Sequence, residues 1–416
     1  MNYTFSEKIL SHFSQKKCQP GDYAIVPVHM SLASDTTAPA AIRAFKAMNG
    51  QKLAKAETFH LVIDHAAPAP TSKIANLHQL MRVFAAKTDC QLHDVGKGIC
   101  HHVMIEEGHA RQDEIILGAD SHSCSYGAIG AFSTGIGSTD LAGIMKTGQT
   151  WLQVPRSIKI DLVGRLAAGV TGKDLCLQLH KTLCDRNIDT SYTAIELWDK
   201  TQDRLSLYQR LPICNMAIEM GAKSTVYINP TKPGRFHPDK AAKYHYETVI
   251  NVELLQPKIA LPSSPDRVTD VCQVSGTKIS LAFLGSCTNN SLEDLHAAAK
   301  IMKGRQLAHG VRLLVAPPTR NVLVKAMADG TMQTILEAGA TLLPSGCGPC
   351  VGTHLGVPSD GEVVISSANR NFLGRMGNRE AQVFLSSAET VAASAITGTI
   401  TDPRDFGPDL QCGDIK

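Results

Sequence analysis

Short apolar runs alternate with amphipathic stretches along most of the chain, and this alternation predicts parallel β-strands connected by helices. The stretch 41–50 begins after Pro39 and ends at an Asn-Gly pair, and the stretch 291–304 begins with the capping-box spacing of Ser291 and Asp294. We expect both to be helices. The strand-like runs lie at 59–64, 114–120, 279–285, 311–316, 340–344 and 362–366. The pattern therefore predicts an α/β fold.

Polar or sulfur-bearing side chains gather where several of these runs end. The first run ends in the dipeptide DH at 64–65, the second in DSH at 120–122, and the third leads into SCTNN at 286–290. Open parallel sheets bind their ligands at the carboxyl ends of the strands. We therefore expect the functional site at this edge of the sheets.

The central stretch, residues 155–270, differs from the rest of the chain. It contains a strand-like run, a helix-like segment at 172–185 and a segment rich in proline, lysine and histidine at 229–247. We interpret it as a second subdomain. The sequence has no internal repeat and no Gly/Ser-rich linker that would divide it further.

The charge balance and the apolar runs exclude several classes of protein. The 416 residues have a formal net charge of +3, so no nucleic-acid partner is expected. No apolar run approaches the roughly 18 residues that a membrane helix needs. The first 22 residues include Glu7 and lack the apolar core of a signal peptide. We expect a cytoplasmic protein with no membrane partner.

Twelve cysteines are the most informative part of the composition. Without an export signal they indicate reduced thiols rather than a disulfide framework. Cys287 in GSCTNN and the pair Cys347 and Cys350 in SGCGPC lie in loops rich in glycine and serine. We interpret the other nine as packing residues: Cys18, Cys90, Cys100, Cys124, Cys176, Cys184, Cys214, Cys272 and Cys412.

Three kinds of site could use the three loop cysteines. CGPC is also a redox motif of thioredoxin-like proteins, although here no tryptophan precedes it and no helix-forming segment follows. A structural zinc site would need a fourth ligand. A 4Fe-4S cluster held by only three thiolates keeps one iron open. Such an iron can act as a Lewis acid on a substrate hydroxyl.

Together, the motifs resemble the aconitase superfamily, and more closely the separate large subunits of 3-isopropylmalate dehydratase and homoaconitase. The resemblance runs from about residue 25 to the end and preserves the order of the motifs. The blocks that carry it are DH at 64–65, GICHH at 98–102, GADSHSCSYGAIGAFSTGIGSTD at 118–140, IELW around Glu196, ICNMAIEMGA at 213–222, LGSCTNNSLEDL at 284–295, SGCGPCVG at 345–352 and SSANRNFLGR at 366–375.

The resemblance implies aconitase-like, three-layer αβα subdomains around a 4Fe-4S cluster, without the swivel domain of full-length aconitases. We place the three α/β subdomains at 1–152 with the His/Asp loops, 153–272 with the Glu196 loop, and 273–416 with the cysteines and the NRNF–GR block. A separate small subunit is then expected to supply the swivel domain, including the serine that acts as the catalytic base.

The resemblance also implies the site residues. The cluster ligands would be Cys287, Cys347 and Cys350. The His–carboxylate pairs would be Asp64 with His65, His101 with Asp120, and His122 with Glu196. A carboxylate fixes the tautomer of its imidazole and raises its basicity, as protonation of a leaving hydroxide requires. The residues contacting substrate or cluster would be Ser121, Asn289, Asn369, Arg370 and Arg375, with Asn289 equally suited to capping a helix. His93 and His102 receive no role.

The activity that the resemblance implies is that of a hydro-lyase of the 4.2.1 class, which isomerises a small hydroxy di- or tricarboxylic acid by dehydration and rehydration. The leading prediction is 2-isopropylmalate to 3-isopropylmalate in leucine biosynthesis. The alternatives within the class are a homoaconitase or a dimethylmalate- or methylmalate-type dehydratase large subunit. Two alternatives belong to another class of protein. They are an RNA-binding protein switched by loss of its cluster and an electron-transfer protein.

Overall fold

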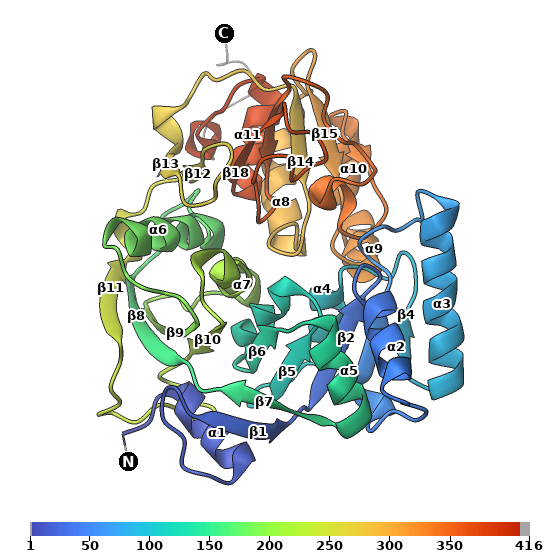
Figure 1. Cartoon of the computed structure of the whole chain (residues 1–416). Coiled ribbons are helices and arrows are strands. Elements are labelled where there is room, and N and C mark those ends of the chain that lie inside the picture. Colours follow the sequence, from blue (N-terminus) through green and yellow to red (C-terminus); the bar gives the residue numbers. More distant parts are fainter. Residues whose placement is uncertain (1, 408–416) are drawn as a thin grey trace.

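The computed structural model describes residues 2–407 and contains three larger sheets and one two-stranded ribbon (Figure 1). The first sheet has the strand order β4-β3-β2-β5-β6, and all its strands are parallel. Its strands are β2 Met30–Ser34, β3 Phe59–Val62, β4 Gln91–His93, β5 Ile115–Gly118 and β6 Phe132–Gly135. The helices of this part are α2 Ala38–Ala47, α3 Ser72–Thr88, α4 Cys100–Glu106 and α5 Ser138–Thr147.

The second sheet is also parallel and has the order β10-β9-β8-β11. Its strands are β8 Arg156–Gly164, β9 Thr193–Thr201, β10 Ser224–Ile228 and β11 Tyr246–Asn251, and its helices are α6 Gly172–Asp185 and α7 Leu207–Asn215. The antiparallel ribbon pairs β1 Tyr23–Pro27 with β7 Gln149–Gln153, and helix α1 Phe5–Ser14 contacts β1.

The third sheet is mixed and has seven strands in the order β13-β12-β18-β17-β14-β15-β16. These are β12 Lys258–Ala260, β13 Val268–Asp270, β14 Leu281–Leu284, β15 Arg312–Val315, β16 Thr341–Leu342, β17 Val363–Ser366 and β18 Gln382–Ser386. Its helices are α8 Leu292–Met302, α9 Arg320–Ala328, α10 Thr331–Glu337 and α11 Ala388–Thr397. Ser291 and Asp294 form the expected capping box at the start of α8.

The α/β prediction is confirmed, and each of the six strand-like runs contains a strand. The subdomain boundaries stay a prediction, and strand pairing near one of them crosses it. The stretch 258–270 was placed in the second subdomain, whereas β12 pairs antiparallel with β18 of the third sheet. Two short antiparallel strands lack the long apolar run that marked the other strands.

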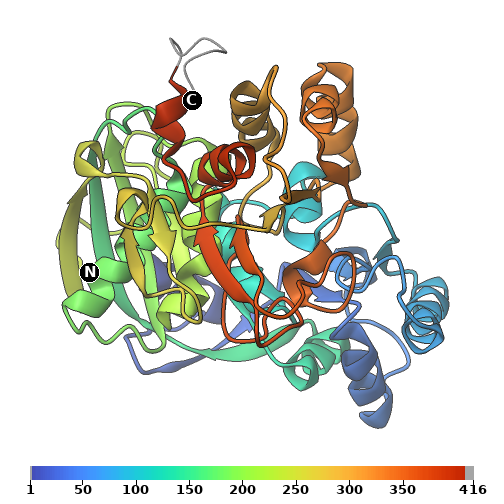
Figure 2. The same cartoon turned by 90° about the horizontal axis from the view of Figure 1, so that it is seen from above.

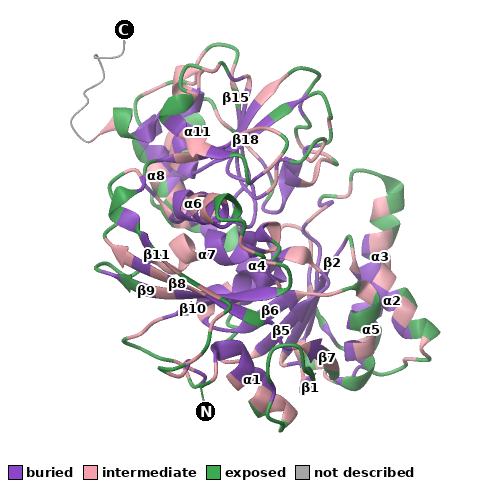
Figure 3. Cartoon of the chain, turned by 60° about the vertical axis from the view of Figure 1, so that its left-hand side comes forward, coloured by how far each residue is buried: buried purple, intermediate pink, exposed green. Residues whose placement is uncertain are grey.

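The three sheets surround a common centre. Figure 1 shows the third sheet at the top, the second at the lower left and the first at the lower right. Seen from above, in Figure 2, the third sheet lies over the junction of the other two. Figure 3 shows buried strands and helices whose outer faces are exposed. The largest hydrophobic cluster joins the second and third sheets and includes Cys350. Between residues 2 and 407, no helix is long and apolar enough to cross a membrane.

Candidate active site

Three buried cysteines meet at this centre. Cys287 lies in the loop after β14, and Cys347 and Cys350 lie in the loop after β16. They line one small cavity together with His65, Ile99, Cys100, His101, Asp120, His122, Ser286, Val351, Asn369 and Arg375. The loops are therefore brought together as the spacing of the cysteines suggested.

Backbone contacts fix the second cysteine loop against the first sheet. The N–H of Cys347 donates to the carbonyl oxygen of Asp64 at 2.9 Å. A Cβ at Gly346 would lie 2.9 Å from the same oxygen, which is closer than real Cβ atoms approach. Gly346, with a φ of +157°, therefore permits this close approach.

Amide and guanidinium donors lie against two of the sulfurs. The Nδ2 atoms of Asn215 and Asn369 are 3.0 and 3.2 Å from Cys287 Sγ. Arg375 Nη2 is 3.8 Å from Cys350 Sγ. Burial raises the pKa of the Cys287 thiol to about 12 and that of Cys347 still further. Buried thiolates here need a cationic partner, and the donors suit thiolate or sulfide acceptors. The three-sulfur set thus fits an iron–sulfur cluster.

Asp120 connects three histidines at the edge of the cavity. Its Oδ1 lies 2.9 Å from Nε2 of His101 and accepts the backbone N–H of His122 at 2.8 Å. Its Oδ2 lies 3.4 Å from Nε2 of His65. Burial alone would raise the pKa of this carboxyl, but the hydrogen bonds from His101 and His65 lower it well below its usual range. Asp120 is therefore ionised, and the predicted contact with His101 is observed.

His65 also contacts Asp64, as predicted. His65 Nδ1 lies 2.8 Å from Asp64 Oδ1, and the other oxygen of Asp64 accepts the N–H of Cys100 at the start of α4. Asp35, which the sequence analysis missed, accepts the backbone N–H groups of Asp64 and His65 at 3.1 and 2.8 Å. This carboxylate fixes the turn that presents both side chains.

The predicted pairing of His122 with Glu196 is wrong. His122 Nε2 lies 3.1 Å from Oε1 of Glu219, which follows α7. Glu196 is in β9, where it accepts from Phe5 N at 2.7 Å, Trp198 Nε1 at 3.3 Å and Tyr244 Oη at 2.8 Å. A position within β9 aims this side chain at the N-terminal segment instead of the centre.

Glu219 also binds a guanidinium that the sequence had indicated. Arg370 Nε lies 2.5 Å from Glu219 Oε1. Burial alone would raise the pKa of Glu219, but His122 and Arg370 lower it below its usual value. Burial lowers the pKa of His122, with a further contribution from the positive charge of Arg370. The carboxylate of Glu219 is therefore paired with the guanidinium of Arg370 and with the imidazole of His122, which is kept neutral.

An open pocket adjoins the cysteine cavity and contains the remaining predicted contacts. Both spaces are lined by His65, Asp120, His122, Val351 and Arg375, and the open pocket adds Thr36, Ser121, Lys223 and Arg370. The Nε atom of Arg375 is buried and has no hydrogen-bond partner among residues 2–407. Two guanidinium groups at the mouth suit a substrate with more than one carboxylate.

Asn289 differs from its predicted roles. Its amide accepts from Lys173 Nζ at 3.3 Å and donates to Asp294 at 3.2 Å, and Ser291 is the cap of α8. Its side chain thus connects Lys173 of α6 with Asp294 of α8. Asn369, in contrast, lies 3.0 Å from His122 Nε2 and contacts Cys287 as expected.

The packing role assigned to nine cysteines is only partly correct. Cys184 and Cys272 are exposed, whereas six others in the described chain are buried. The latter are Cys18, Cys90, Cys100, Cys124, Cys176 and Cys214. Cys412 lies outside the described residues.

Two further residues of the site lay within motifs quoted above but carried no assignment. Asn215 and Glu219 belong to the block ICNMAIEMGA. An amide and a carboxylate within a family motif were the signal that could have pointed to them. His102, also without a role, lies 3.1 Å from the backbone carbonyl oxygen of Cys287 and so positions that loop.

Comparisons with known proteins point to one family. A model of the aconitase family (aconitate hydratase) matches residues 7–232 and 272–398. The 3-isopropylmalate dehydratase large subunit 1 of Methanopyrus kandleri is 39% identical over 98% of this chain and 100% of its own length. The homoaconitase large subunit of Thermus thermophilus is 39% identical over 98% of both chains. A 3-isopropylmalate dehydratase large subunit 1 of Deinococcus radiodurans is 39% identical over 97% of this chain and 94% of its own length.

Proposed function

This chain belongs to the aconitase family of hydro-lyases, and we propose that it is the large subunit of a dehydratase that interconverts 2- and 3-isopropylmalate in leucine biosynthesis. The observation that carries the proposal is one continuous site. Three cysteines, three histidines held by Asp120 and two arginines line a cavity and its adjoining pocket. Relatives of nearly the same length carry the name of this enzyme.

The family implies a 4Fe-4S cluster, and we assign Cys287, Cys347 and Cys350 as its ligands. When bound, the cluster supplies a Lewis-acidic iron for a substrate hydroxyl. Asn215 and Asn369 would donate hydrogen bonds to its sulfur atoms, as they do to Cys287 here. Such hydrogen bonds tune and hold a cluster.

The side chains of this chain bind and orient the substrate and supply the proton. Arg370 and Arg375 bind the substrate carboxylates from the open pocket and so orient the carbon that loses its hydroxyl. The ionised Asp120 accepts a hydrogen bond from Nε2 of His101 and so orients this imidazole, and we assign His101 as the acid that protonates the departing hydroxide. Asp64 and Asp120 hold His65 between them. Glu219 orients His122 and Arg370 together.

A separate small subunit completes the proposed enzyme. The relatives are named large subunits, and their lengths match this chain almost completely. The proposal assigns the catalytic base, a serine, to the partner. The large subunit alone should therefore be nearly inactive.

The substrate is tested by the ratio of kcat/KM values across a panel of acids. The chain is purified anaerobically with its small subunit and given isopropylmalate, homocitrate-derived acids and dimethylmalate. The proposal predicts the highest kcat/KM for isopropylmalate and almost no turnover by the chain alone. Equal turnover by the isolated chain would contradict the two-subunit proposal.

A homoaconitase is the second candidate. The Thermus thermophilus relative is as similar, at 39% identity, as the isopropylmalate dehydratase relatives quoted above. A higher kcat/KM for the homocitrate-derived acid in the same panel would select it over the leading proposal.

A further inference from the structure

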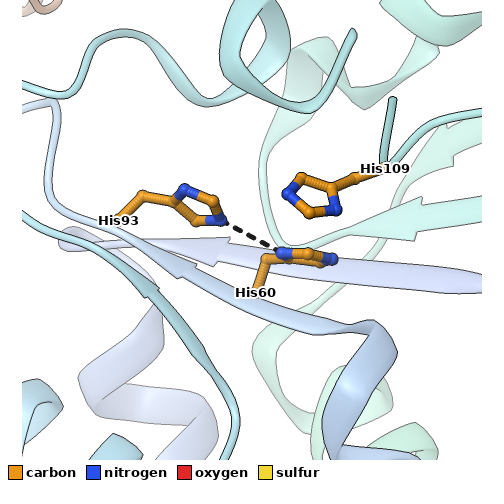
Figure 4. Close-up of side chains that lie close together, drawn as sticks. All are labelled: His60, His93 and His109. Carbon is orange, nitrogen blue, oxygen red and sulfur yellow. Dashed lines mark hydrogen bonds between the residues drawn. The ribbon is translucent and has the colours of Figure 1, made fainter. Parts of the chain in front are cut away.

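Three histidines meet at a second place in the first sheet, away from the cysteine cavity (Figure 4). His60 lies in β3, His93 ends β4, and His109 lies in the turn after α4. β3 and β4 are parallel and pair Val62 with His93. Because side chains two residues apart share a face of a strand, His60 and His93 lie on the same face.

The three rings are close enough to share one ion. One ring nitrogen from each histidine lies within 4.8 Å of the others. His60 Nδ1 is 3.1 Å from His93 Nε2, and the rings of His60 and His109 have centroids 4.4 Å apart. Two nitrogen ligands of a tetrahedral Zn²⁺ are about 3.3 Å apart, since each Zn–N bond is about 2.0–2.1 Å. The 3.1 Å between His60 Nδ1 and His93 Nε2 is already close to this spacing.

Glu107 lies on the outer side of two of these rings. Its Oε2 is 3.6 Å from His93 Nδ1 and 3.4 Å from His109 Nε2, while Lys97 pairs with its other oxygen. Glu107 thus leaves two nitrogens for an ion, His93 Nε2, which now contacts His60 Nδ1, and His109 Nδ1. A carboxylate on the far nitrogen is the arrangement that orients histidine ligands of metals.

The protonation state suits the same ion. Burial, together with the neighbouring imidazoles, lowers the pKa of His60 to about 3, and burial lowers that of His93 to about 4 although Glu107 raises it. Neutral imidazole is the form that binds metals. His60 and His93 are buried and His109 is partly exposed, so the ion has a route from solvent at His109.

We propose that His60, His93 and His109 form a binding site for one divalent transition-metal ion, with Zn²⁺ as the best-suited ion. Three imidazoles and no sulfur favour zinc or a similar borderline metal over calcium or magnesium. Glu107 positions His93 and His109, and the fourth position is open to water. The site does not depend on the proposed dehydratase activity.

The ion would connect the elements that carry the catalytic side chains. β3 leads from His60 to Asp64, and α4 leads from Cys100 and His101 to His109. The turn after α4 is already fixed, because the N–H groups of His109 and Ala110 both donate to the Met104 carbonyl oxygen. The metal thus joins the far end of α4 to β3 and β4.

The test measures zinc on the full chain after anaerobic cluster reconstitution, followed by dialysis at micromolar free Zn²⁺. Metal analysis is expected to find one Zn²⁺ per chain. Zinc-edge X-ray absorption is expected to show nitrogen and oxygen ligands with imidazole scattering and no sulfur. Absence of bound zinc, or sulfur ligation, would overturn the site and leave the 3.1 Å contact as a hydrogen bond between two rings.

Substitutions then identify the ligands. His93→Gln and His109→Gln should each weaken Zn²⁺ binding at least about tenfold, the lower limit for residues that merely orient ligands. The matched control is His296→Gln, which replaces an exposed histidine paired with Asp329 and should leave zinc binding unchanged. An unchanged affinity for Zn²⁺ in both His93→Gln and His109→Gln would contradict the proposal. Should either variant be insoluble, the absorption spectrum of the wild-type chain decides the question alone.

Discussion

Replacing Glu219 by glutamine removes the charge that holds His122 and Arg370 in the site. Glu219 Oε1 lies 2.5 Å from Arg370 Nε and 3.1 Å from His122 Nε2, and its side chain is 4% exposed. Glutamine keeps an oxygen and nearly the same volume, so the change isolates the charge. The variant leaves a partly buried guanidinium without its carboxylate.

The size of the effect follows from these contacts. A hydrogen bond to a charged group contributes about 1.5–3 kcal/mol. Because every 1.36 kcal/mol changes a rate tenfold, kcat/KM of the variant should fall about 10- to 150-fold. Arg370 binds substrate in our account, so part of the loss should appear in KM. The assay is steady-state dehydration by the anaerobic two-subunit enzyme.

Glu196 provides the matched control, because Glu196→Gln makes the same chemical change at a buried position outside the site. We expect this variant to keep kcat/KM within about twofold of wild type, as the residue contacts neither substrate nor reacting groups. A full rate in Glu219→Gln, or a large loss in Glu196→Gln with a normal melting temperature, would refute the assignment of Glu219.

Three further predictions concern stability, the cluster and acid catalysis. Burial raises the pKa of Glu196 to about 7 from its ordinary 4.5. The free energy of unfolding should therefore fall by about 3 kcal/mol as the pH rises from 4.5 to about 7. In denaturant titrations, Glu196→Gln should not show this loss. Cys347→Ser should abolish the cluster absorbance and all turnover, because an oxygen replaces one of only three thiolates. His101→Asn should keep the absorbance while turnover falls about 10²- to 10⁴-fold, because the amide cannot replace the imidazole, oriented by Asp120, that protonates the departing hydroxide.

Each of these predictions can fail. A wild-type unfolding free energy that stays flat or rises between pH 4.5 and 7, compared with the Gln variant, would remove the burial argument for Glu196. Normal iron content in Cys347→Ser would mean that this sulfur is not a ligand. An unchanged rate in His101→Asn, measured at equal iron content, would remove His101 from the acid role.

Much of the site could be predicted from local sequence, because strand ends place side chains at one edge. Asp64 follows β3 and Asp120 follows β5, and both parallel strands end on the same side of the first sheet. Their polar residues therefore meet in space, as the pattern indicated. The cysteine loop after β14 follows the same rule in the third sheet.

The partner of His122 could not be predicted in this way. Glu196 and Glu219 both lie in motifs of the family, and the choice depends on whether a side chain is within a strand or in the turn after a helix. Glu196 in β9 faces Phe5 and Tyr244, which are distant in sequence. Such long-range contacts leave no periodic signal in the chain.

The short strands β12 and β13 illustrate the same limit in the fold. Each has only three residues, too few for an alternating pattern, and tertiary pairing places β12 beside β18 and β13 beside β12. His60, His93 and His109 likewise have no recognisable spacing, since their meeting depends on strand register and on the turn after α4.

The central claim is that substrate binds at the three-cysteine site of this chain. It is tested most directly by electron paramagnetic resonance of the reduced cluster in the two-subunit enzyme, before and after addition of 2-isopropylmalate. Our account predicts that the signal shifts on addition of the acid, and that the shift requires higher concentrations in Arg370→Lys, which cannot form the same forked contacts. A spectrum that does not change at saturating acid would contradict the account and favour an electron-transfer role.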